Sequence, residues 1–321
     1  MATITSAGSG NWNAGASWTG GSVPGAGDEA HIDSGHTITL TANASVGNVV
    51  IDGGTIAGGG YKITCVKTSG RLFDHSGTIT GNLDVELQGT HSTTEDFMGT
   101  GNIRNLILNG SGLNVDIGRD TTIDGNLTIT QGTLHTNSTH NHDLTVTGGD
   151  ISVSGTLTLN DSTVQVTDTS SALSIGNTGT VTCGDTNLTV NAVSLGQGNF
   201  TAPSASGSFI ITGEKSNLAF DYDGNQFTHN GGTIDIRTQA TTLVDFGSNN
   251  GTAHIGNVKI NHASCVAKLQ NAGSLLGNLD IALGTLDTDG NALTVAGDVD
   301  VTGTLTGNAS AISVGSLYLL N

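Results

Sequence analysis

Short runs of alternating apolar and polar residues recur along the whole chain. Runs such as TITL (37–40), GNLTIT (125–130) and GTLTL (155–159) place Ile or Leu at every second position, which gathers the apolar side chains on one face of a β-strand. Gly, Asn, Asp and Ser separate the runs, and these residues favour turns because they tolerate positive φ or bond their own backbone. No segment shows the 3.6-residue period of an amphipathic helix. The pattern therefore predicts an all-β chain of short strands.

A Gly-Asn pair followed by alternating apolar residues marks the repeat. Several neighbouring copies lie roughly 20 to 24 residues apart, which is the spacing of stacked repeats. Strands this short, without crossover helices, predict a right-handed parallel β-helix (β-solenoid) of about 13–15 short rungs. The pairs begin at Gly47, Gly81, Gly101, Gly125, Gly256 and Gly277. We expect their Asn residues to stack in ladders, each side-chain amide donating to the rung above, for example at Asn82, Asn126 and Asn278.

The alternative fold is a two-layer β-sandwich, whose core is usually rich in aromatic residues. Aromatic residues make up only 4% of this chain, which favours the solenoid. The three cysteines, Cys65, Cys183 and Cys265, are far apart and lie in strand-like runs. We therefore expect three buried thiols rather than a disulfide framework.

One long segment appears twice. GNLTITQGTLHT begins at Gly125 and GNLDIALGTLDT begins at Gly277, 152 positions later (277 − 125). Similar residues flank both phrases, so residues 94–166 and 242–320 are expected to be two copies of one multi-rung unit. The copies share apolar and Gly positions and differ at polar ones, which indicates selection on shape rather than on a catalytic site.

Charge excludes several classes of partner. The chain has 9 Lys and Arg against 27 Asp and Glu, a net charge of −18. Such a surface repels nucleic acid and anionic lipid. No apolar run approaches the ~18 residues that span a bilayer, and the start of the chain lacks the basic and apolar regions of a secretory signal. We therefore expect a protein made in the cytoplasm that binds neither nucleic acid nor membrane.

Both tryptophans lie near the start of the chain. Trp12 and Trp18, with Pro24 holding the adjoining turn, are predicted to cap the first rung, so that residues 1–36 form an N-terminal cap and residues 37–321 the β-helix. A platform for stacking sugars is the alternative role for the two indoles.

The same opening carries a resemblance. The spacing W-x5-W, the stretch GGSVPGAGD and the stretch GHTITL, within residues 10–55, resemble the start of β-solenoid structural proteins of tailed phages and of bacterial surface adhesins. The resemblance implies a structural or adhesive role and a parallel homotrimer. Adhesins normally carry an export signal, so its absence favours a phage virion protein: a head decoration protein, head fibre or tail fibre that docks on capsid or tail subunits. The alternative is a cell-surface adhesin that binds a host glycan.

The last strand-like run, ISVGSLYLLN, is apolar and uncharged. An exposed strand edge of this kind promotes aggregation. We therefore expect a neighbouring subunit to cover it.

Two groups of residues are candidate metal ligands. His140 and His142, near His135 and Asp143, would face one side of a strand, and three such pairs on a trimer axis would offer six imidazoles to a first-row metal. Alternate aspartates are candidate calcium ligands. An exposed loop and ordinary tight turns are the respective alternatives. The aspartates are Asp221 and Asp223 in DYDGN, and Asp287 and Asp289 in DTDGN.

Enzymatic chemistry finds little support. A glycosidase needs two carboxylates at a set separation, and the sequence does not pair the available ones. No Ser-His-Asp motif, P-loop or dinucleotide fingerprint is present. The chain is therefore predicted not to be an enzyme and to need no cofactor, with a tailspike-like polysaccharide depolymerase as the remaining alternative. The available carboxylates are Asp74, Glu86, Glu95, Asp96, Glu214 and Asp221.

Overall fold

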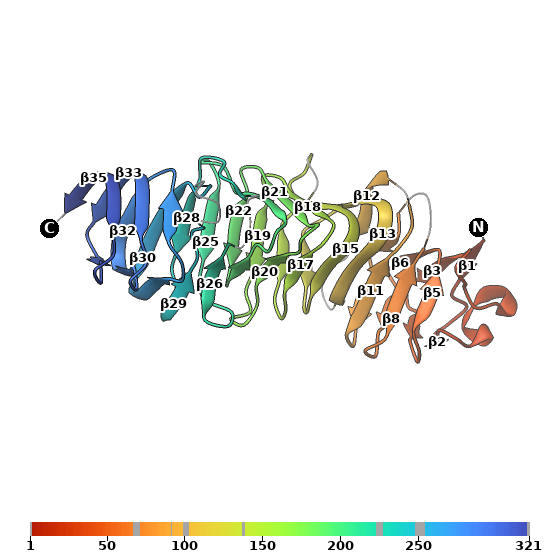
Figure 1. Cartoon of the computed structure of the whole chain (residues 1–321). Coiled ribbons are helices and arrows are strands. Elements are labelled where there is room, and N and C mark those ends of the chain that lie inside the picture. The colour runs from red at the N-terminus through yellow and green to blue at the C-terminus, as the bar shows by residue number, and fades with distance from the viewer. Residues whose placement is uncertain are drawn as a thin grey trace. The chain divides into compact units, whose positions relative to one another are not determined.

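The fold is a β-solenoid of about 13 turns, built from parallel strands, which confirms the predicted fold class (Figure 1). A computed structural model describes residues 2–66, 71–90, 92–98, 103–136, 139–222, 227–247 and 254–319. Tertiary contacts divide the chain into two units. Unit 1 comprises Met1–Gly148 and Gly155–Thr158, and unit 2 comprises Gly149–Ser154 and Leu159–Asn321.

Unit 1 contains the first sixteen strands, two short 3-10 helices and most of a later strand. The helices are η1 (Gly15–Ser17) and η2 (Thr19–Gly21). The strands are β1 (Thr3–Thr5), β2 (Gly10–Asn11), β3 (Glu29–Asp33), β4 (Thr37–Thr39), β5 (Ala44–Val46), β6 (Asn48–Asp52), β7 (Thr55–Ala57), β8 (Lys62–Cys65), β9 (Phe73–His75), β10 (Thr78–Thr80), β11 (Leu83–Leu87), β12 (Ser92–Met98), β13 (Ile103–Ile117), β14 (Thr121–Ile123), β15 (Leu127–His135), β16 (Leu144–Val146) and β18 (Thr156–Leu159).

Unit 2 contains the remaining strands. They are β17 (Ile151–Val153), β19 (Thr163–Val166), β20 (Leu173–Ile175), β21 (Thr180–Cys183), β22 (Asn187–Val190), β23 (Val193–Ser194), β24 (Asn199–Thr201), β25 (Ser208–Ile211), β26 (Leu218–Asp221), β27 (Phe227–Thr228), β28 (Thr233–Ile236), β29 (Thr241–Val244), β30 (Asn257–Leu269), β31 (Gly273–Leu275), β32 (Leu279–Asp287), β33 (Leu293–Val301), β34 (Thr304–Thr306) and β35 (Ile312–Leu319).

Successive turns stack in parallel and in register, so that equivalent side chains form columns. In unit 1, β4, β7 and β10 align Ile38, Ile56 and Ile79, all buried, while the flanking Thr residues face outward. In unit 2, a cluster of phenylalanines fills the core instead. The cluster consists of Phe200, Phe209, Phe220, Phe227 and Phe246, with neighbouring ring centroids 5.5 to 6.3 Å apart. Alternation along each strand therefore sets which side chains enter the core.

The Gly-Asn pair has a specific structural role. The Oδ1 atom of Asn257 accepts a hydrogen bond of 2.9 Å from the backbone N–H of Asn278, one turn later. Asn105 and Asn126 form the same bond at the same distance. At both places the side-chain oxygen accepts a backbone N–H, which the sequence did not predict, and at Asn126 the side-chain amide also donates to Oδ1 of Asn105 at 3.3 Å, as expected. Asn82 differs, since it adopts a left-handed backbone (φ 52°) in its turn.

At Gly277 and Gly125 the glycine makes room for this bond. A Cβ atom at Gly277 would lie 2.3 Å from Oδ1 of Asn257. At Gly125 it would lie 2.4 Å from the backbone oxygen of Arg104 and 2.7 Å from Oδ1 of Asn105. At these two positions any side chain would thus collide with the preceding turn, and the close approach of two turns requires glycine there.

The two similar segments pair in the same way. Leu106 is the register partner of Leu127 in β13 and β15, and Val258 is the partner of Leu279 in β30 and β32. Both residues of the second pair lie 152 positions after those of the first (258 − 106, 279 − 127). The register shifts also fall at equivalent places, after Leu108 in one copy and after Ile260 in the other. The copies thus share their backbone pairing as well as their apolar residues.

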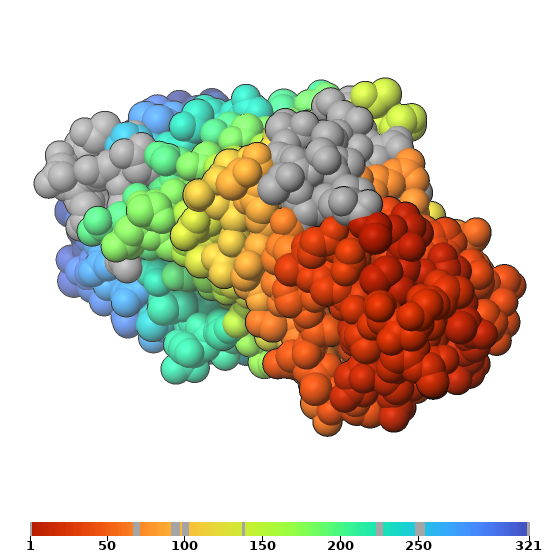
Figure 2. Space-filling model, turned by 90° about the vertical axis from the view of Figure 1, so that its right-hand side faces the viewer, coloured from red at the N-terminus to blue at the C-terminus, as the bar shows by residue number. Residues whose placement is uncertain are grey.

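The start of unit 1 buries both tryptophans. Their rings meet edge to face with centroids 5.2 Å apart, and Nε1 of Trp18 donates to the backbone oxygen of Trp12 at 2.6 Å. The rings are 4% and 2% exposed, so neither offers a face on which a sugar could stack. Pro24 is also buried. Figure 2 looks onto this region, whose residues form a continuous surface.

Parallel pairing begins before residue 37, where the β-helix was predicted to start. Strand β1 pairs with β3, and β3 pairs with β6. Much of the predicted cap therefore already follows the stacking of the solenoid. In β35, Leu317 and Leu319 occupy the register positions of Val299 and Val301 but are 51% and 73% exposed. Coverage of β35 by a neighbouring subunit stays a prediction.

Candidate functional site

A hairpin in unit 2 departs from the regular stacking. The backbone groups of Lys215 and Leu218 bond each other in both directions, at 2.9 and 3.0 Å. The two residues between them, Ser216 and Asn217, both have positive φ, 55° and 68°. Two consecutive positive φ values are typical of a type I′ turn, in which Gly is usually needed. Non-glycine residues in this conformation store strain that tends to occur at functional sites.

A buried asparagine holds the base of the hairpin. Asn191 is 4% exposed, and its Nδ2 atom donates to the backbone oxygens of Ser171 and Glu214, at 2.9 and 2.8 Å. These bonds join three successive turns at one point. The hairpin is therefore fixed to the solenoid rather than free to swing.

Lys215 extends from this hairpin across the adjacent face. Its Nζ atom lies 2.6 Å from both carboxylate oxygens of Asp150, 65 residues earlier in the chain. Asp150 also accepts the backbone N–H of Ala172 at 2.8 Å. Both charged side chains are partly exposed, so the pair adds only about 0–1 kcal/mol to stability. The main effect of this ion pair is to hold the aliphatic part of the Lys215 side chain over strands β20 and β23.

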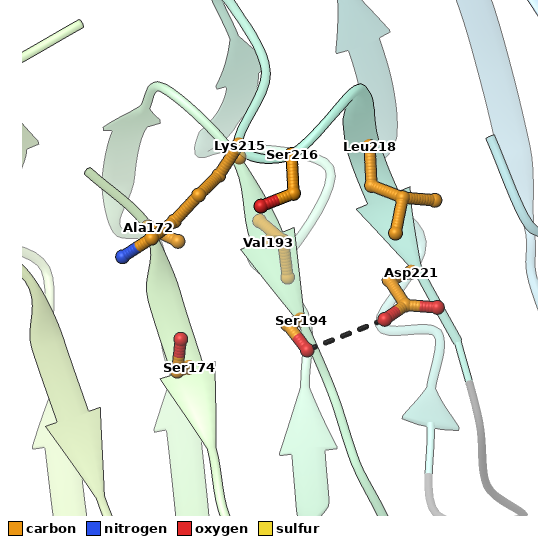
Figure 3. Close-up of a pocket in the computed structure, with 9 residues that line it drawn as sticks. Ala172, Ser174, Val193, Ser194, Lys215, Ser216, Leu218 and Asp221 are labelled. Carbon is orange, nitrogen blue, oxygen red and sulfur yellow. Dashed lines mark hydrogen bonds between the residues drawn. The ribbon is translucent and has the colours of Figure 1, made fainter. Parts of the chain in front are cut away.

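A hollow of about 260 Å³ lies beneath the hairpin (Figure 3). Its floor is apolar and small, formed by Ala172, Ala192 and Val193. Lys215, Ser216 and Leu218 form the overhanging wall, and the opposite side is polar. The polar side chains are those of Ser174, Ser194 and Asp221.

The three polar residues form one outward-facing column. Ser174 is the register partner of Ser194, and Ser194 is the partner of Asp221, on β20, β23 and β26. The Ser194 hydroxyl faces Oδ2 of Asp221 at 3.4 Å. Parallel strands lie about 4.8 Å apart, so the column presents three oxygen-bearing groups at regular spacing. Such a row can bind a ligand with several hydroxyls.

Two of the other candidate catalytic carboxylates, Asp74 and Glu86, form ion pairs away from the hollow. Arg71 holds Asp74 at 2.8 Å, and Lys62 holds Glu86 at 2.5 Å. Burial favours a raised pKa for Glu86, but hydrogen bonds from Lys62, Asn109 and Gln88 outweigh it and lower the pKa below its usual value. A glycosidase acid needs a raised pKa, so Glu86 is unsuited to that role. The side chains of Glu95 and Asp96 lie outside the described part of the chain.

Glu214 belongs to the hairpin rather than to a carboxylate pair. Its Oε2 atom is buried and has no hydrogen-bond partner among the described residues. Of the candidate carboxylates whose side chains are described, Asp221 alone lines the hollow beneath the hairpin.

The candidate histidine ligands lie in a turn instead of on a strand. The rings of His140 and His142 stack with centroids 5.6 Å apart, and Nδ1 of His142 lies 3.5 Å from Oδ1 of Asp120. His135 ends strand β15. The expected arrangement of two imidazoles projecting from one strand face is therefore wrong, because the loop after β15 carries both residues.

The candidate calcium ligands also do not gather at one site in the described residues. Asp287 and Asp289 form a turn in which the N–H of Asp289 donates to Oδ1 of Asp287 at 2.9 Å. The Lys268 ammonium lies 3.7 and 3.3 Å from the two carboxylates and partly neutralises them. Asp221 lines the hollow, and Asp223 lies outside the described residues. Across the described chain, no three His, Cys, Asp or Glu side chains converge in a way that could hold a metal ion.

Positive charge is distributed singly over the surface. Seven of the nine Lys and Arg residues pair with a nearby carboxylate: Lys62, Arg71, Arg104, Lys215, Arg237, Lys259 and Lys268. These pairs leave no cluster of cations in the described residues for a phosphate backbone. The described residues also include no helix with the length and hydropathy that crossing a membrane requires.

Sequence reasoning missed the hairpin and its hollow. The segment GEKSNL offers a weak turn signal, Ser-Asn between two apolar runs, but no Gly at the positive-φ positions. Asp150 and Lys215 are too far apart in sequence for any local pattern to pair them. Comparison with protein-family models, with curated proteins and with solved structures found no match to this chain, so the assignment of function depends on the site and the fold alone.

Proposed function

We propose that this chain is a non-enzymatic structural protein of a tailed-phage virion, acting as a head decoration protein, head fibre or tail fibre. The observation that carries the proposal is the pair of segments with identical strand registers 152 residues apart. Backbone pairing and core positions agree between the copies, whereas outward positions differ. A chain selected mainly for its stacked framework would have this property.

Surface chemistry supports the same role. Most cations are neutralised singly, and the net charge is −18. An acidic surface of this kind limits self-association and nonspecific binding to nucleic acid. A β-solenoid is compatible with structural and adhesive roles alike. Among the described residues, Asp221 is the one carboxylate that lines the hollow, which favours a role without catalysis.

The proposal includes a homotrimer that docks on capsid or tail subunits. Sedimentation equilibrium of the purified chain tests the first part, with an expected mass of about 97 kDa (3 × 32.2 kDa). A mass of one chain at micromolar concentration would count against the trimer.

Immunogold electron microscopy tests the location. Antibodies raised against the chain should label regular positions on virions purified from lysates of the source. Labelling of host cell surfaces without particles would instead favour the adhesin alternative. Label on neither would contradict the structural proposal, and glycan cleavage by the purified chain would favour a depolymerase.

A further inference from the structure

We propose that the hollow beneath the Lys215 hairpin binds one uncharged saccharide unit of a glycan. The inference does not depend on the proposed virion role, because it rests only on unit 2. Its starting point is the pairing of an apolar floor with a polar column, seen in Figure 3. A sugar ring has the matching character, with C–H groups on its faces and hydroxyls on its rim.

The polar column supplies both donors and acceptors. The hydroxyls of Ser174 and Ser194 can each donate one hydrogen bond and accept two, and the Asp221 carboxylate accepts only. Strand stacking places these groups about 4.8 Å apart along the solenoid. A carboxylate can accept from two neighbouring hydroxyls at once. The column can thus bind several hydroxyls of one ring.

Charge favours a neutral ligand. The Lys215 ammonium is bound by both oxygens of Asp150, so it does not act as a free cation. Asp221 adds a negative charge to the hollow, within a chain whose net charge is −18. Acidic sugars and phosphates would be repelled. The hydroxyls of a neutral sugar meet no such penalty.

The hairpin provides a preformed wall. Its strained turn at Ser216 and Asn217 is held by two backbone bonds, and Asn191 anchors its base. A wall that is already ordered spares the ligand the entropic cost of ordering it. Leu218 contributes an apolar surface on this side of the hollow.

Affinity should be low. The hollow, about 260 Å³, is smaller than the roughly 300–1,000 Å³ of drug-sized pockets, and no aromatic ring lines it. We expect a Kd on the order of 1–10 mM for a single saccharide unit. Several copies on one assembly would raise the effective affinity by avidity.

Saturation-transfer difference NMR of the whole chain tests the proposal. The probes are the methyl glycosides of glucose, galactose, mannose and N-acetylglucosamine, at millimolar concentration, with cadaverine as a cationic probe. At least one glycoside should give a saturable signal. Asp221→Asn should weaken binding about tenfold, because bonds to a charged acceptor are the strong ones. Ser194→Trp should abolish binding by filling the hollow.

Ser152→Ala is the matched control. Ser152 is the register partner of Ser174, one turn beyond the lining residues, so its loss should leave the signal unchanged. Circular dichroism shows whether each variant folds. Binding that is unaltered in both Asp221→Asn and Ser194→Trp would overturn the proposal, as would the absence of signal with all four glycosides. A signal from cadaverine alone would show that Asp221 selects cations, which also contradicts it.

Discussion

A side chain at position 277 would collide with the side chain of Asn257, so we predict that Gly277 and Asn257 are energetically coupled. Asn257→Ala removes one hydrogen bond to the N–H of Asn278, which costs about 0.5–1.5 kcal/mol. Asn278 is exposed, so water can replace the lost acceptor and the cost should fall at the lower end. Gly277→Ala places a Cβ atom 2.3 Å from Oδ1 of Asn257, which must move away and break the same bond.

The single change Gly277→Ala has two opposing effects on the free energy of unfolding. Loss of the bond and displacement of Asn257 destabilise the native state by about 1–3 kcal/mol. Restriction of the unfolded chain by Ala offsets about 0.4–1 kcal/mol. Once Asn257→Ala has removed the obstructing oxygen, Gly277→Ala should cost at least about 1 kcal/mol less, which is the coupling energy of the pair. The Asn257 backbone nitrogen, at 2.9 Å, keeps a residual cost in either background.

Urea unfolding of the four chains of this double-mutant cycle, followed by circular dichroism, measures the coupling. Gly307→Ala is the control, since its Cβ would make only an ordinary contact of 3.5 Å with Ile312. The equivalent pair in the other copy, Gly125 and Asn105, should couple less, because the backbone oxygen of Arg104 is the nearest obstacle there. Additive changes for Gly277 and Asn257, within about 0.5 kcal/mol, would refute the reasoning.

Three further predictions concern the core and the buried polar groups. Burial raises the pKa of the Cys183 thiol to about 12 and also raises the pKa values of Cys65 and Cys265. The native chain should therefore not react with Ellman's reagent at pH 8, whereas the chain unfolded in urea should release three equivalents of the reagent's thiolate. Stoichiometric reaction of the native protein would contradict the burial of the thiols. The pKa of Glu86 is lowered in the folded state, so its stabilising effect is present above the unfolded value near 4.5 and is lost as pH falls through the folded value. The difference in unfolding free energy between wild type and Glu86→Gln should therefore be constant above about pH 5.5 and shrink in acid, and a difference that grows in acid would be the opposite sign. Phe200→Ala should cost about 3–5 kcal/mol and lower hydrogen-exchange protection by at least about 100-fold in peptides of residues 181–246. Peptides of residues 29–65 should keep their protection, because each turn of a solenoid contacts only its neighbours.

The framework could be predicted because its signals are local. Alternation within a few residues decides which side chains enter the core, as the buried column of Ile38, Ile56 and Ile79 shows. The spacing of the Gly-Asn pairs reports the length of a turn directly. The backbone N–H donors of the Asn ladder were not predicted, because the choice of donor depends on the offset between adjacent turns.

The hollow could not be predicted because turn length varies. Within its polar column, Ser194 follows Ser174 by 20 residues and Asp221 follows Ser194 by 27, whereas Ser174 follows its register partner Ser152, outside the lining, by 22 (differences of the register partners). If the predicted length of a turn is wrong by a few residues, a different polar side chain is placed in the column. Asp221 was accordingly grouped with Asp223 as a calcium ligand, whereas the structure aligns it with two serines.

The position of the hollow within the sequence bears on where specific function resides. Its lining residues run from Ala172 to Asp221, which falls between the two similar segments, 94–166 and 242–320. Outward positions differ freely between those segments: Asp124 and Gln131 in one correspond to the exposed Leu276 and Leu283 in the other, 152 residues later. The shared framework tolerates such exchanges because the Asn bond and the apolar columns, not the outward side chains, hold successive turns together. The hairpin at Lys215 and Leu218 instead lies over the hollow, outside the repeating columns. We therefore expect specific recognition in the segment that was not duplicated, and a purely structural role for the two that were.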